Sequence, residues 1–167
     1  MVVIVFGVSG AGKTVVGQLL ARELGWQFYD ADDFHPAANI EKMHAGVSLT
    51  DDDRKPWLEK LRGLIEQLLK AKQNSVLACS ALKKKYRDLL RVSDEVQFVY
   101  LRGDRTLIAD HLRKRRGHFM NPALLDSQFA DLEEPERSEN ALTVELGRAP
   151  EKLVDEIRER LGPTSAK

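Results

Sequence analysis

The feature that most constrains the fold is the glycine-rich stretch GVSGAGKT at residues 7–14, which follows the short apolar run Val2–Phe6. The stretch satisfies the pattern G-x-x-x-x-G-K-[ST], and apolar residues at four-residue spacing follow it as far as Leu24. A buried strand, a tight loop and a helix are therefore expected in that order. Glycines let successive backbone N–H groups curl around phosphate oxygens, and a helix N-terminus adds partial positive charge. The stretch therefore predicts a phosphate-binding loop.

This loop predicts ATP and Mg²⁺ as cofactors. Lys13 would bridge the β- and γ-phosphates, and the Thr14 hydroxyl would bind the metal ion. The predicted phosphate contacts are Gly7, Val8, Ser9, Gly10, Ala11, Gly12, Lys13 and Thr14.

The rest of the chain alternates short β-branched or aromatic runs with amphipathic segments. The expected strands are 26–30, 75–79, 96–101 and 141–146, and the expected helices are 36–44, 50–69, a segment containing 86–90, 104–114, one that starts at 121, and 150–161. Thr50 and Asp104 are expected N-caps, and Pro56 is expected to leave a tight turn or a kink. Such alternation predicts an α/β fold with a parallel sheet wrapped by helices.

Length and composition favour a single soluble domain over residues 1–167. The 26 basic and 26 acidic residues cancel, which argues against a whole-domain electrostatic footprint for nucleic acid. Cys79 is the single cysteine, so no internal disulfide can form and a reducing compartment is expected. The apolar N-terminus is too short to span a bilayer and lacks a basic signal-peptide region. We therefore expect a cytoplasmic protein without membrane or nucleic-acid partners.

Carboxylates gather in the segment DADDFH, directly after the second expected strand. Open α/β sheets place their ligands at the carboxyl ends of parallel strands, where the phosphate loop also lies. A solvated acidic turn with Asx caps is the alternative. In a kinase, Asp32 would accept the proton of the acceptor hydroxyl or orient it, and Asp30 would hold Mg²⁺ through water.

The segment RKRRGHF at residues 113–119 places four cations in a row at the end of an expected helix. A solvated helix C-terminus explains one or two of these charges, because cations favour the helix dipole. All four, followed by Gly117, favour a mobile lid around residues 113–122. Its arginines would neutralise charge on the transferring phosphoryl group and exclude water. Nucleic-acid binding is disfavoured by the neutral net charge and the lack of interleaved aromatic residues.

In combination, these motifs resemble the gluconokinase family over roughly residues 3–160. The matching stretches, in order, are GVSGAGKT, DADDFHPAANIEKMHAGVSLTDDDRKPWL, CSALKKKYRDLLR, RRGHF and SQFADLEEP. The resemblance implies ATP-dependent phosphorylation of D-gluconate to 6-phospho-D-gluconate. It also implies a three-layer P-loop kinase fold whose five-stranded parallel sheet has the order 2-3-1-4-5, with a helical lid, and a homodimer.

The resemblance assigns further residues to the site. It places Lys13, Asp32 and Arg115 in catalysis, and its substrate contacts are Asp32, His35, Arg54, Lys83, Arg87 and His118. Arg54 looks like a clamp for the substrate carboxylate, because a planar guanidinium binds a carboxylate through two parallel hydrogen bonds. The alternative for His35 is that its side chain only completes the hydrogen bonds of a turn before Pro36. The alternative for Arg54 is that it pairs with a neighbouring aspartate of the segment TDDDR.

Two other functions stay open at this point. One is a kinase of another small carboxylated polyol, such as shikimate, on the same fold. The other is a nucleotide-binding regulatory module without transfer activity, against which Lys13, Thr14, Asp32 and the basic lid together argue. The segments DDDRKPW and HPAANIEKMHAG favour gluconate.

Overall fold

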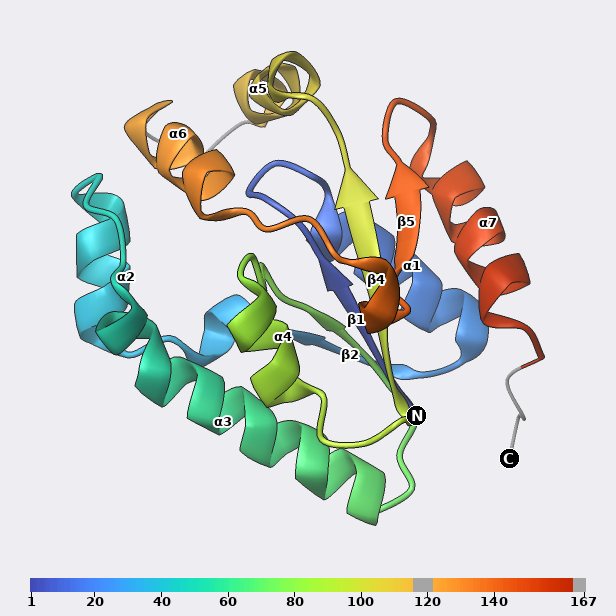
Figure 1. Cartoon of the computed structure of the whole chain (residues 1–167). Coiled ribbons are helices and arrows are strands. Elements are labelled where there is room, and N and C mark those ends of the chain that lie inside the picture. Colours follow the sequence, from blue (N-terminus) through green and yellow to red (C-terminus); the bar gives the residue numbers. More distant parts are fainter. Residues whose placement is uncertain (116–121, 164–167) are drawn as a thin grey trace.

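The computed structural model of the chain describes residues 1–115 and 122–163. Its centre is a five-stranded sheet in the order β2-β3-β1-β4-β5 (Figure 1), and all four neighbouring pairs of strands are parallel. The strands are β1 (Val2–Phe6), β2 (Gln27–Asp30), β3 (Ser75–Ala78), β4 (Val96–Arg102) and β5 (Leu142–Glu145). The parallel sheet expected from the sequence pattern, and the strand order implied by the family resemblance, are both confirmed.

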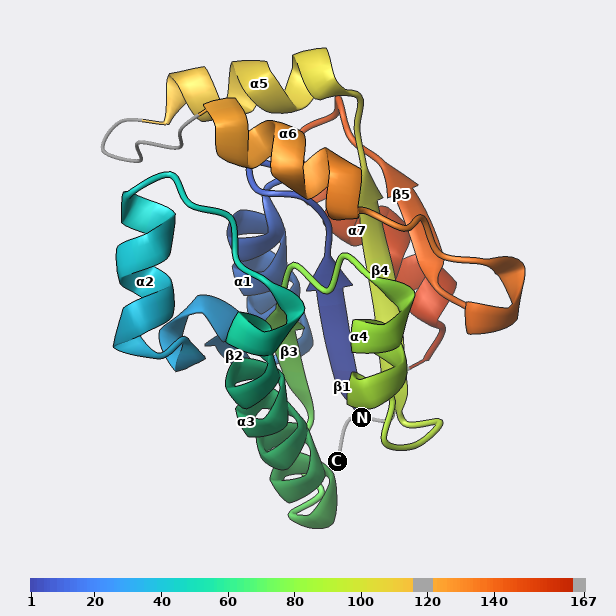
Figure 2. The same cartoon turned by 60° about the vertical axis from the view of Figure 1, so that its left-hand side comes forward.

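Helices cover both faces of the sheet and its carboxyl edge. They are α1 (Lys13–Leu24), α2 (Ala37–His44), α3 (Asp51–Lys70), α4 (Lys84–Leu90), α5 (Arg105–Lys114), α6 (Pro122–Asp131) and α7 (Pro150–Leu161), with short 3₁₀ helices η1 (Ala31–Phe34) and η2 (Arg137–Glu139). Helices α3 and α4 pack on one face, and α1 and α7 pack on the other. Figure 2 shows α5 and α6 crossing above the ends of the strands. The predicted three-layer architecture is confirmed.

Strand β1 explains why the first apolar run does not alternate with polar residues. Val2, Ile4 and Phe6 belong to the core beneath α3 and α4, whereas Val3 and Val5 belong to the core beneath α1 and α7. A central strand of a parallel sheet is covered on both faces, so each of its side chains is buried. This strand therefore delivers the following loop to the middle of the carboxyl edge.

The helix starts at Thr50 and Asp104 were predicted correctly. Thr50 Oγ1 accepts a hydrogen bond from Asp53 N at 3.1 Å, and Thr50 N donates to Asp53 Oδ2 at 2.9 Å. Asp104 Oδ1 accepts from Leu107 N at 2.8 Å. Of the tight turn or kink expected at Pro56, the tight turn is wrong, because α3 continues through this residue from Asp51 to Lys70, and the kink stays a prediction. Pro56 removes only one backbone hydrogen bond near the helix start, and the capping box and the buried face of α3 hold the helix together.

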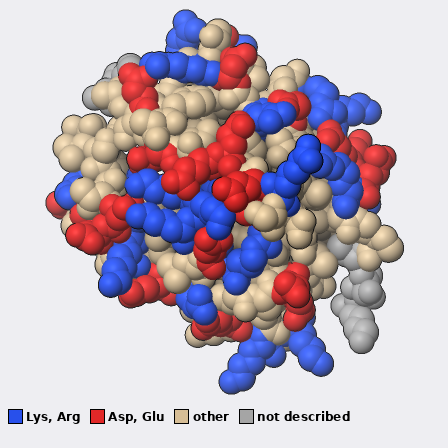
Figure 3. All heavy atoms as spheres, viewed as in Figure 1, with Lys and Arg blue, Asp and Glu red and all other residues tan. Residues whose placement is uncertain are grey.

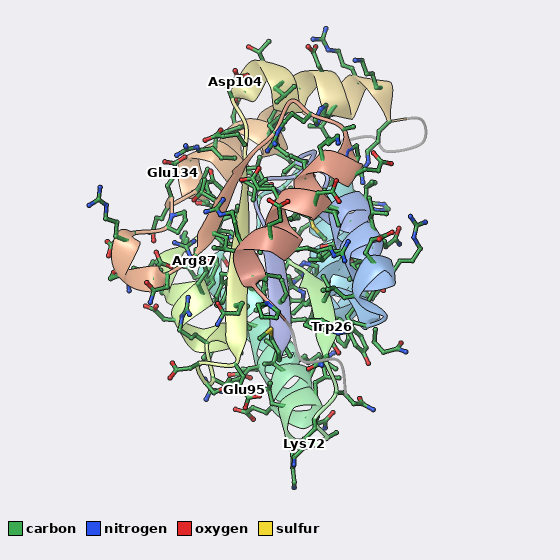
Figure 4. All side chains as sticks on the ribbon, turned by 90° about the vertical axis from the view of Figure 1, so that its right-hand side faces the viewer. Trp26, Lys72, Arg87, Glu95, Asp104 and Glu134 are labelled. Carbon is green, nitrogen blue, oxygen red and sulfur yellow. The ribbon has the colours of Figure 1, made fainter. Side chains whose placement is uncertain are left out.

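The two edges of the sheet differ in what they carry. Figure 4 labels Glu95, just before β4 at the amino edge, and Asp104, just after β4 at the carboxyl edge. The carboxyl edge carries the phosphate loop, η1 and the segment before α4, which is the arrangement expected for a ligand site.

Within the described ranges, no helix is both long enough and apolar enough to cross a membrane.

Candidate active site

The phosphate loop joins β1 to α1 and has the backbone conformation that its glycines predict. Gly10 has φ 83° and Gly12 has φ 88°, both in the left-handed region. A Cβ atom on Gly10 would also lie 2.7 Å from Cγ of Leu112, so α5 closes directly over the loop. His111 on α5 donates from Nδ1 to the carbonyl oxygen of Gly10 at 3.0 Å. Contacts with Leu112 and His111 of α5 therefore hold the loop in this conformation.

The N-terminus of α1 leaves backbone donors for an anion. Its N-cap, Gly12, supplies no side-chain acceptor to the first turn, so the helix start retains its attraction for phosphate. Earlier in the loop, the Ser9 N–H donates to Oε1 of Gln128 on α6 at 2.6 Å. An oxygen acceptor from α6 thus already occupies one of the N–H groups predicted to bind phosphate.

Lys13 lies at the meeting point of several charged groups. Its Nζ donates to the carbonyl oxygen of Val8 at 3.0 Å. Burial lowers the pKa of Lys13, the charges of Asp32 and Asp30 act in the opposite direction, and Arg115 lowers the pKa further. The charges of Asp30, Asp32 and Arg115, which come from two other sequence motifs, therefore all act on Lys13.

Thr14 and Asp30 form the oxygen pair expected at a magnesium site. Thr14 Oγ1 donates to Asp30 Oδ2 at 3.0 Å, and Asp30 Oδ1 accepts from the backbone N–H of Asp32 at 3.0 Å. Hydroxyl and carboxylate oxygens are the hard donors that Mg²⁺ prefers, so this pair fits the ion. The second bond also fixes the start of η1, which carries Asp32.

A cluster of charged and phenolic side chains lies on the other side of the carboxyl edge. We call it the acceptor-side cluster; it comprises Asp51, Arg54, Lys83, Tyr86 and Asp131. Arg54 donates from one terminal nitrogen to Tyr86 Oη at 3.0 Å and from the other to Asp131 Oδ2 at 3.1 Å. The alternative that Arg54 pairs with a neighbouring aspartate of α3 is therefore wrong, because its carboxylate partner comes from α6.

The remaining members of the acceptor-side cluster are also paired. Lys83 Nζ lies 3.0 Å from Asp51 Oδ1 and 4.0 Å from Asp131 Oδ1. Hydrogen bonds from Lys85, Tyr86 and Lys83 hold the pKa of Asp51 well below its usual range. Figure 3 shows basic and acidic side chains interspersed over the face that contains α2, α4 and α6. The cations expected to bind substrate thus already have anionic partners.

Arg87 requires a correction. We expected a substrate contact, but its side chain is 1% exposed and donates from Nε and Nη2 to the two Glu139 carboxylate oxygens at 2.7 and 3.1 Å. Its Nη1 donates to the carbonyl oxygens of Ala81 and Leu82, each at 3.0 Å. Figure 4 labels Arg87. Because these partners bury the guanidinium, Arg87 supports the backbone before Lys83 and is not placed to meet a substrate.

His35 is held between α2 and α3. Its ring stacks on Trp57 with centroids 4.2 Å apart and planes 12° apart, and its Nδ1 lies 3.2 Å from Asn39 Nδ2. Burial, reinforced by the charge of Arg54, lowers the pKa of His35 to about 4. Trp57 donates from Nε1 to the carbonyl oxygen of Ala31 at 2.7 Å. His35 is therefore a neutral ring beside the predicted carboxylate clamp.

The predicted lid is described only at its ends. Arg115 is exposed just after α5, whereas residues 116–121, including His118, lie outside the described residues.

Cys79, at the end of β3, is buried, and burial raises its pKa to about 12, as expected for an inert core thiol.

Several side chains of the site were missed by sequence reasoning. They are Asn39, Asp51, Tyr86, Gln128 and Asp131. All five lie inside the stretches that carried the family resemblance, HPAANIEK, TDDDRKPW, SALKKKYR and SQFADLEEP. Motif membership was the available signal, but helical spacing alone does not show which motif residues face the site.

Comparison with known proteins finds that the chain is similar to small-molecule kinases. A family model described as shikimate kinase matches residues 9–161. The thermosensitive gluconokinase of Escherichia coli (strain K12) is 48% identical over 137 residues, which cover 81% of this chain and 73% of that protein. The crystal structure of a gluconokinase from Sinorhizobium meliloti 1021 is 37% identical, with a TM-score of 0.81, and covers 95% of this chain and 94% of that one.

The shikimate kinase of Aquifex aeolicus is more distant. Its crystal structure matches with a TM-score of 0.61 and 20% identity over 96% of each chain, which shows a shared fold. The chain belongs to the gluconokinase family, and the family model that matches most of its length is the one described as shikimate kinase.

Proposed function

We propose that the protein transfers the γ-phosphoryl group of ATP to a hydroxyl of D-gluconate, giving 6-phospho-D-gluconate and ADP. The observation that carries the proposal is the convergence of Lys13, Asp32 and Arg54 at one edge of the sheet. Lys13 belongs to the phosphate loop, and Asp32 supplies a carboxylate beside that loop. Arg54 supplies a cation that is complementary in charge and shape to the carboxylate of a substrate. The 48% identity to a gluconokinase supports gluconate as the acceptor.

In this proposal the phosphate loop holds the donor. The backbone N–H groups of residues 7–14 bind the phosphates, and the Lys13 ammonium stabilises charge on the β- and γ-phosphate oxygens. Thr14 and, through a water molecule, Asp30 would hold Mg²⁺, which neutralises phosphate charge when bound. Arg115 would add positive charge from the end of α5.

Asp32 would act on the acceptor. Its carboxylate accepts the proton of the attacking hydroxyl as the oxygen bonds to the γ-phosphorus and the bond to the leaving ADP oxygen breaks. The hydrogen bond from Asp32 N to Asp30 fixes the backbone that presents this carboxylate. Closing residues 113–122 over the site would keep water from competing with the acceptor.

Arg54 and Lys83 would bind the carboxylate of gluconate. Both cations now contact Asp131, at 3.1 and 4.0 Å. A substrate carboxylate that binds Arg54 in the bidentate manner would replace this side-chain carboxylate. His118 would join the substrate contacts from the lid.

Shikimate is the second candidate acceptor, because the family model that matches the chain is described as shikimate kinase. Both acceptors carry a carboxylate and several hydroxyls, so charge alone does not separate them. The higher identity to gluconokinases than to a solved shikimate kinase favours gluconate.

A substrate panel tests the proposal. The protein is incubated with ATP, Mg²⁺ and, separately, gluconate, other aldonates, shikimate or glucose, and release of ADP is coupled to an optical readout. We expect the highest kcat/KM with gluconate. Turnover on shikimate alone would establish the second candidate, and no turnover above background on any aldonate would contradict the proposal.

We also propose the homodimer that the family resemblance implies. Sedimentation equilibrium should give about twice the chain mass of 18.9 kDa. A single species at the mass of one chain, over the whole accessible concentration range, would contradict it.

A further inference from the structure

Asn39 is a buried polar residue on α2 whose hydrogen bonds determine the state of its neighbour. The residue as a whole is only 3% exposed. Nδ2 lies 2.8 Å from the backbone carbonyl oxygen of Asp53 and 3.2 Å from Nδ1 of His35. Because a carbonyl oxygen only accepts, the first contact fixes which end of the amide is the nitrogen. The same nitrogen must then donate its second hydrogen to His35, so His35 Nδ1 is the acceptor.

An acceptor at Nδ1 leaves one place for the proton of a neutral ring. The two imidazole nitrogens of a neutral histidine divide the donor and acceptor roles between them, so His35 carries its hydrogen on Nε2. The neutral form is favoured because the ring is partly buried and the charge of Arg54 acts on it. The other charged pair nearby, Lys42 with Asp53, is satisfied internally at 2.8 Å.

The ring is also fixed in orientation. Trp57 stacks on one of its faces and is itself anchored through Nε1 to the carbonyl oxygen of Ala31, the residue before Asp32. In residues 1–115 and 122–163, no group accepts from Nε2 of His35. Nor is Nε2 sealed from solvent, since Ser75 Oγ is the sole described side-chain polar atom that is both buried and unpaired. A fixed N–H donor is therefore open to a ligand beside Arg54 and Asp32.

We propose that Asn39 is a positioning residue that holds His35 in the tautomer protonated on Nε2, and that this N–H donates to a hydroxyl or carboxylate oxygen of the phosphoryl acceptor. The identity of the acceptor rests on the proposed function, whereas the tautomer does not. A neutral donor orients an acceptor oxygen without placing a second cation against Arg54. Asn39 thereby contributes to acceptor recognition without touching the acceptor.

Nitrogen-15 NMR of the histidine rings tests the tautomer directly, in the full-length protein without ligands. The His35 signals are assigned by their loss in His35→Gln. We expect an unprotonated, pyridine-type Nδ1 and a protonated, pyrrole-type Nε2, unchanged across the neutral pH range. A protonated Nδ1, or shifts averaged between the two tautomers, would overturn the proposal.

The substitution Asn39→Asp should move the proton of His35 to the other ring nitrogen. A carboxylate only accepts, so His35 should take a proton on Nδ1, and its pKa should rise. Asn74→Asp is the matched control, since Asn74 lies before β3 at the opposite edge of the sheet and should leave the His35 signals in place. Unchanged His35 signals in a folded Asn39→Asp protein would contradict the role of Asn39. If this variant does not fold, the wild-type spectrum decides.

Two substitutions of His35 test the donor in function. His35→Gln keeps an N–H donor near the position of Nε2, whereas His35→Phe keeps an aromatic ring on Trp57 and removes the donor. We expect His35→Phe to raise the KM for gluconate about tenfold and to leave the KM for ATP unchanged, with His35→Gln restoring most of the loss. Equal losses in both variants would show that the N–H is not used.

The two hypotheses fail in different ways. The predicted tautomer together with no turnover of gluconate would refute the proposed function and leave the positioning by Asn39 standing. Turnover of gluconate together with a protonated Nδ1 would refute the role of Asn39 alone.

Discussion

The donor and acceptor halves of the site are built on different principles. The donor half is one continuous segment, residues 7–14, which presents mainly backbone N–H groups. The acceptor half combines side chains from α2, α3, α4 and α6, and nearly every contact joins residues far apart in the chain, such as Arg54 with Asp131. A backbone cradle serves any triphosphate, whereas an assembled cluster can select one acceptor.

The two halves also differ in their charge balance. Lys13 is partly desolvated, and the two neighbouring carboxylates belong to the predicted catalytic and metal sites. In the acceptor half, by contrast, Arg54 and Lys83 already have carboxylate partners. In the proposed mechanism, binding of a substrate carboxylate there would exchange one anion for another. Affinity for the acceptor should therefore depend on how strongly the resident carboxylates hold these cations.

The largest expected effect is on protein stability, through the buried ion pair that supports the acceptor half. Glu139→Gln leaves the buried Arg87 guanidinium without its anion, which should lower the free energy of unfolding by about 3 kcal/mol at neutral pH. Urea denaturation followed by circular dichroism measures this change. Ser138→Ala, at the exposed neighbouring position, is the control.

The same ion pair predicts a pH dependence. Burial would raise the pKa of Glu139, but hydrogen bonds from Arg87 and from the Glu136 backbone, together with the charges of Arg87 and Lys84, outweigh it and hold the pKa below its usual value. A carboxyl group whose pKa is lower in the folded state stabilises the protein above its unfolded pKa, and this contribution is lost as pH falls through the folded pKa. The stability difference between wild type and Glu139→Gln should therefore shrink in acid. A constant difference would contradict the pair.

The next largest effect concerns the boundary between the halves. Asp32→Asn should lower kcat by about 10²-fold or more, because the amide cannot accept the proton of the acceptor hydroxyl. Binding of ATP, measured by calorimetry, should stay nearly unchanged. Asp33→Asn, one position further along the exposed turn, is the matched control. An unchanged kcat in Asp32→Asn would remove Asp32 from the mechanism.

Arg54 tests the acceptor half by itself. Arg54→Met should raise the KM for gluconate about 30-fold, the scale expected for a charged hydrogen-bond pair, with little change in the KM for ATP. Arg62→Met removes an arginine from the same helix on the side that contacts Glu66 and Leu89. This control should change neither constant. A shift in the KM for ATP in Arg54→Met that equals the shift for gluconate would argue against separate halves.

The smallest effect concerns the contact between α6 and the donor half. Gln128 Oε1 occupies the Ser9 N–H that is predicted to bind phosphate. Gln128→Ala should therefore lower the KM for ATP by about threefold, the scale of one neutral hydrogen bond. Steady-state kinetics at saturating gluconate measure this change. A raised KM for ATP would show that Gln128 supports the loop instead of competing with phosphate.

The contrast between the halves also explains how far sequence reasoning reached. The phosphate loop was predictable because glycine conformation, helix start and lysine spacing are local properties of residues 7–14. The Thr50 capping box was predictable for the same reason. Lys83 and Arg87 lie one helical turn apart in the sequence, and both looked like substrate contacts. Arg87 instead pairs with Glu139, which is 52 residues away in the chain.

Other features of the acceptor half depend on contacts of the same kind. The spacing of α6 did not show that Asp131 meets Arg54, because that contact requires α6 to lie across the carboxyl edge. The position of Asn39 within a family motif did not reveal its two hydrogen bonds. Local chemistry thus predicted the donor half, and tertiary packing was needed for the acceptor half.

The central claim is that the donor half accepts ATP while the acceptor half selects a carboxylated polyol. The most direct test compares kcat/KM for D-gluconate and for D-glucitol, which has the same carbon chain with a hydroxymethyl group in place of the carboxylate. We predict at least about 10²-fold preference for gluconate in the wild type, because only a carboxylate can replace Asp131 on Arg54 through two parallel hydrogen bonds, and a much smaller preference in Arg54→Met. Equal kcat/KM for the two compounds in the wild type would contradict the account.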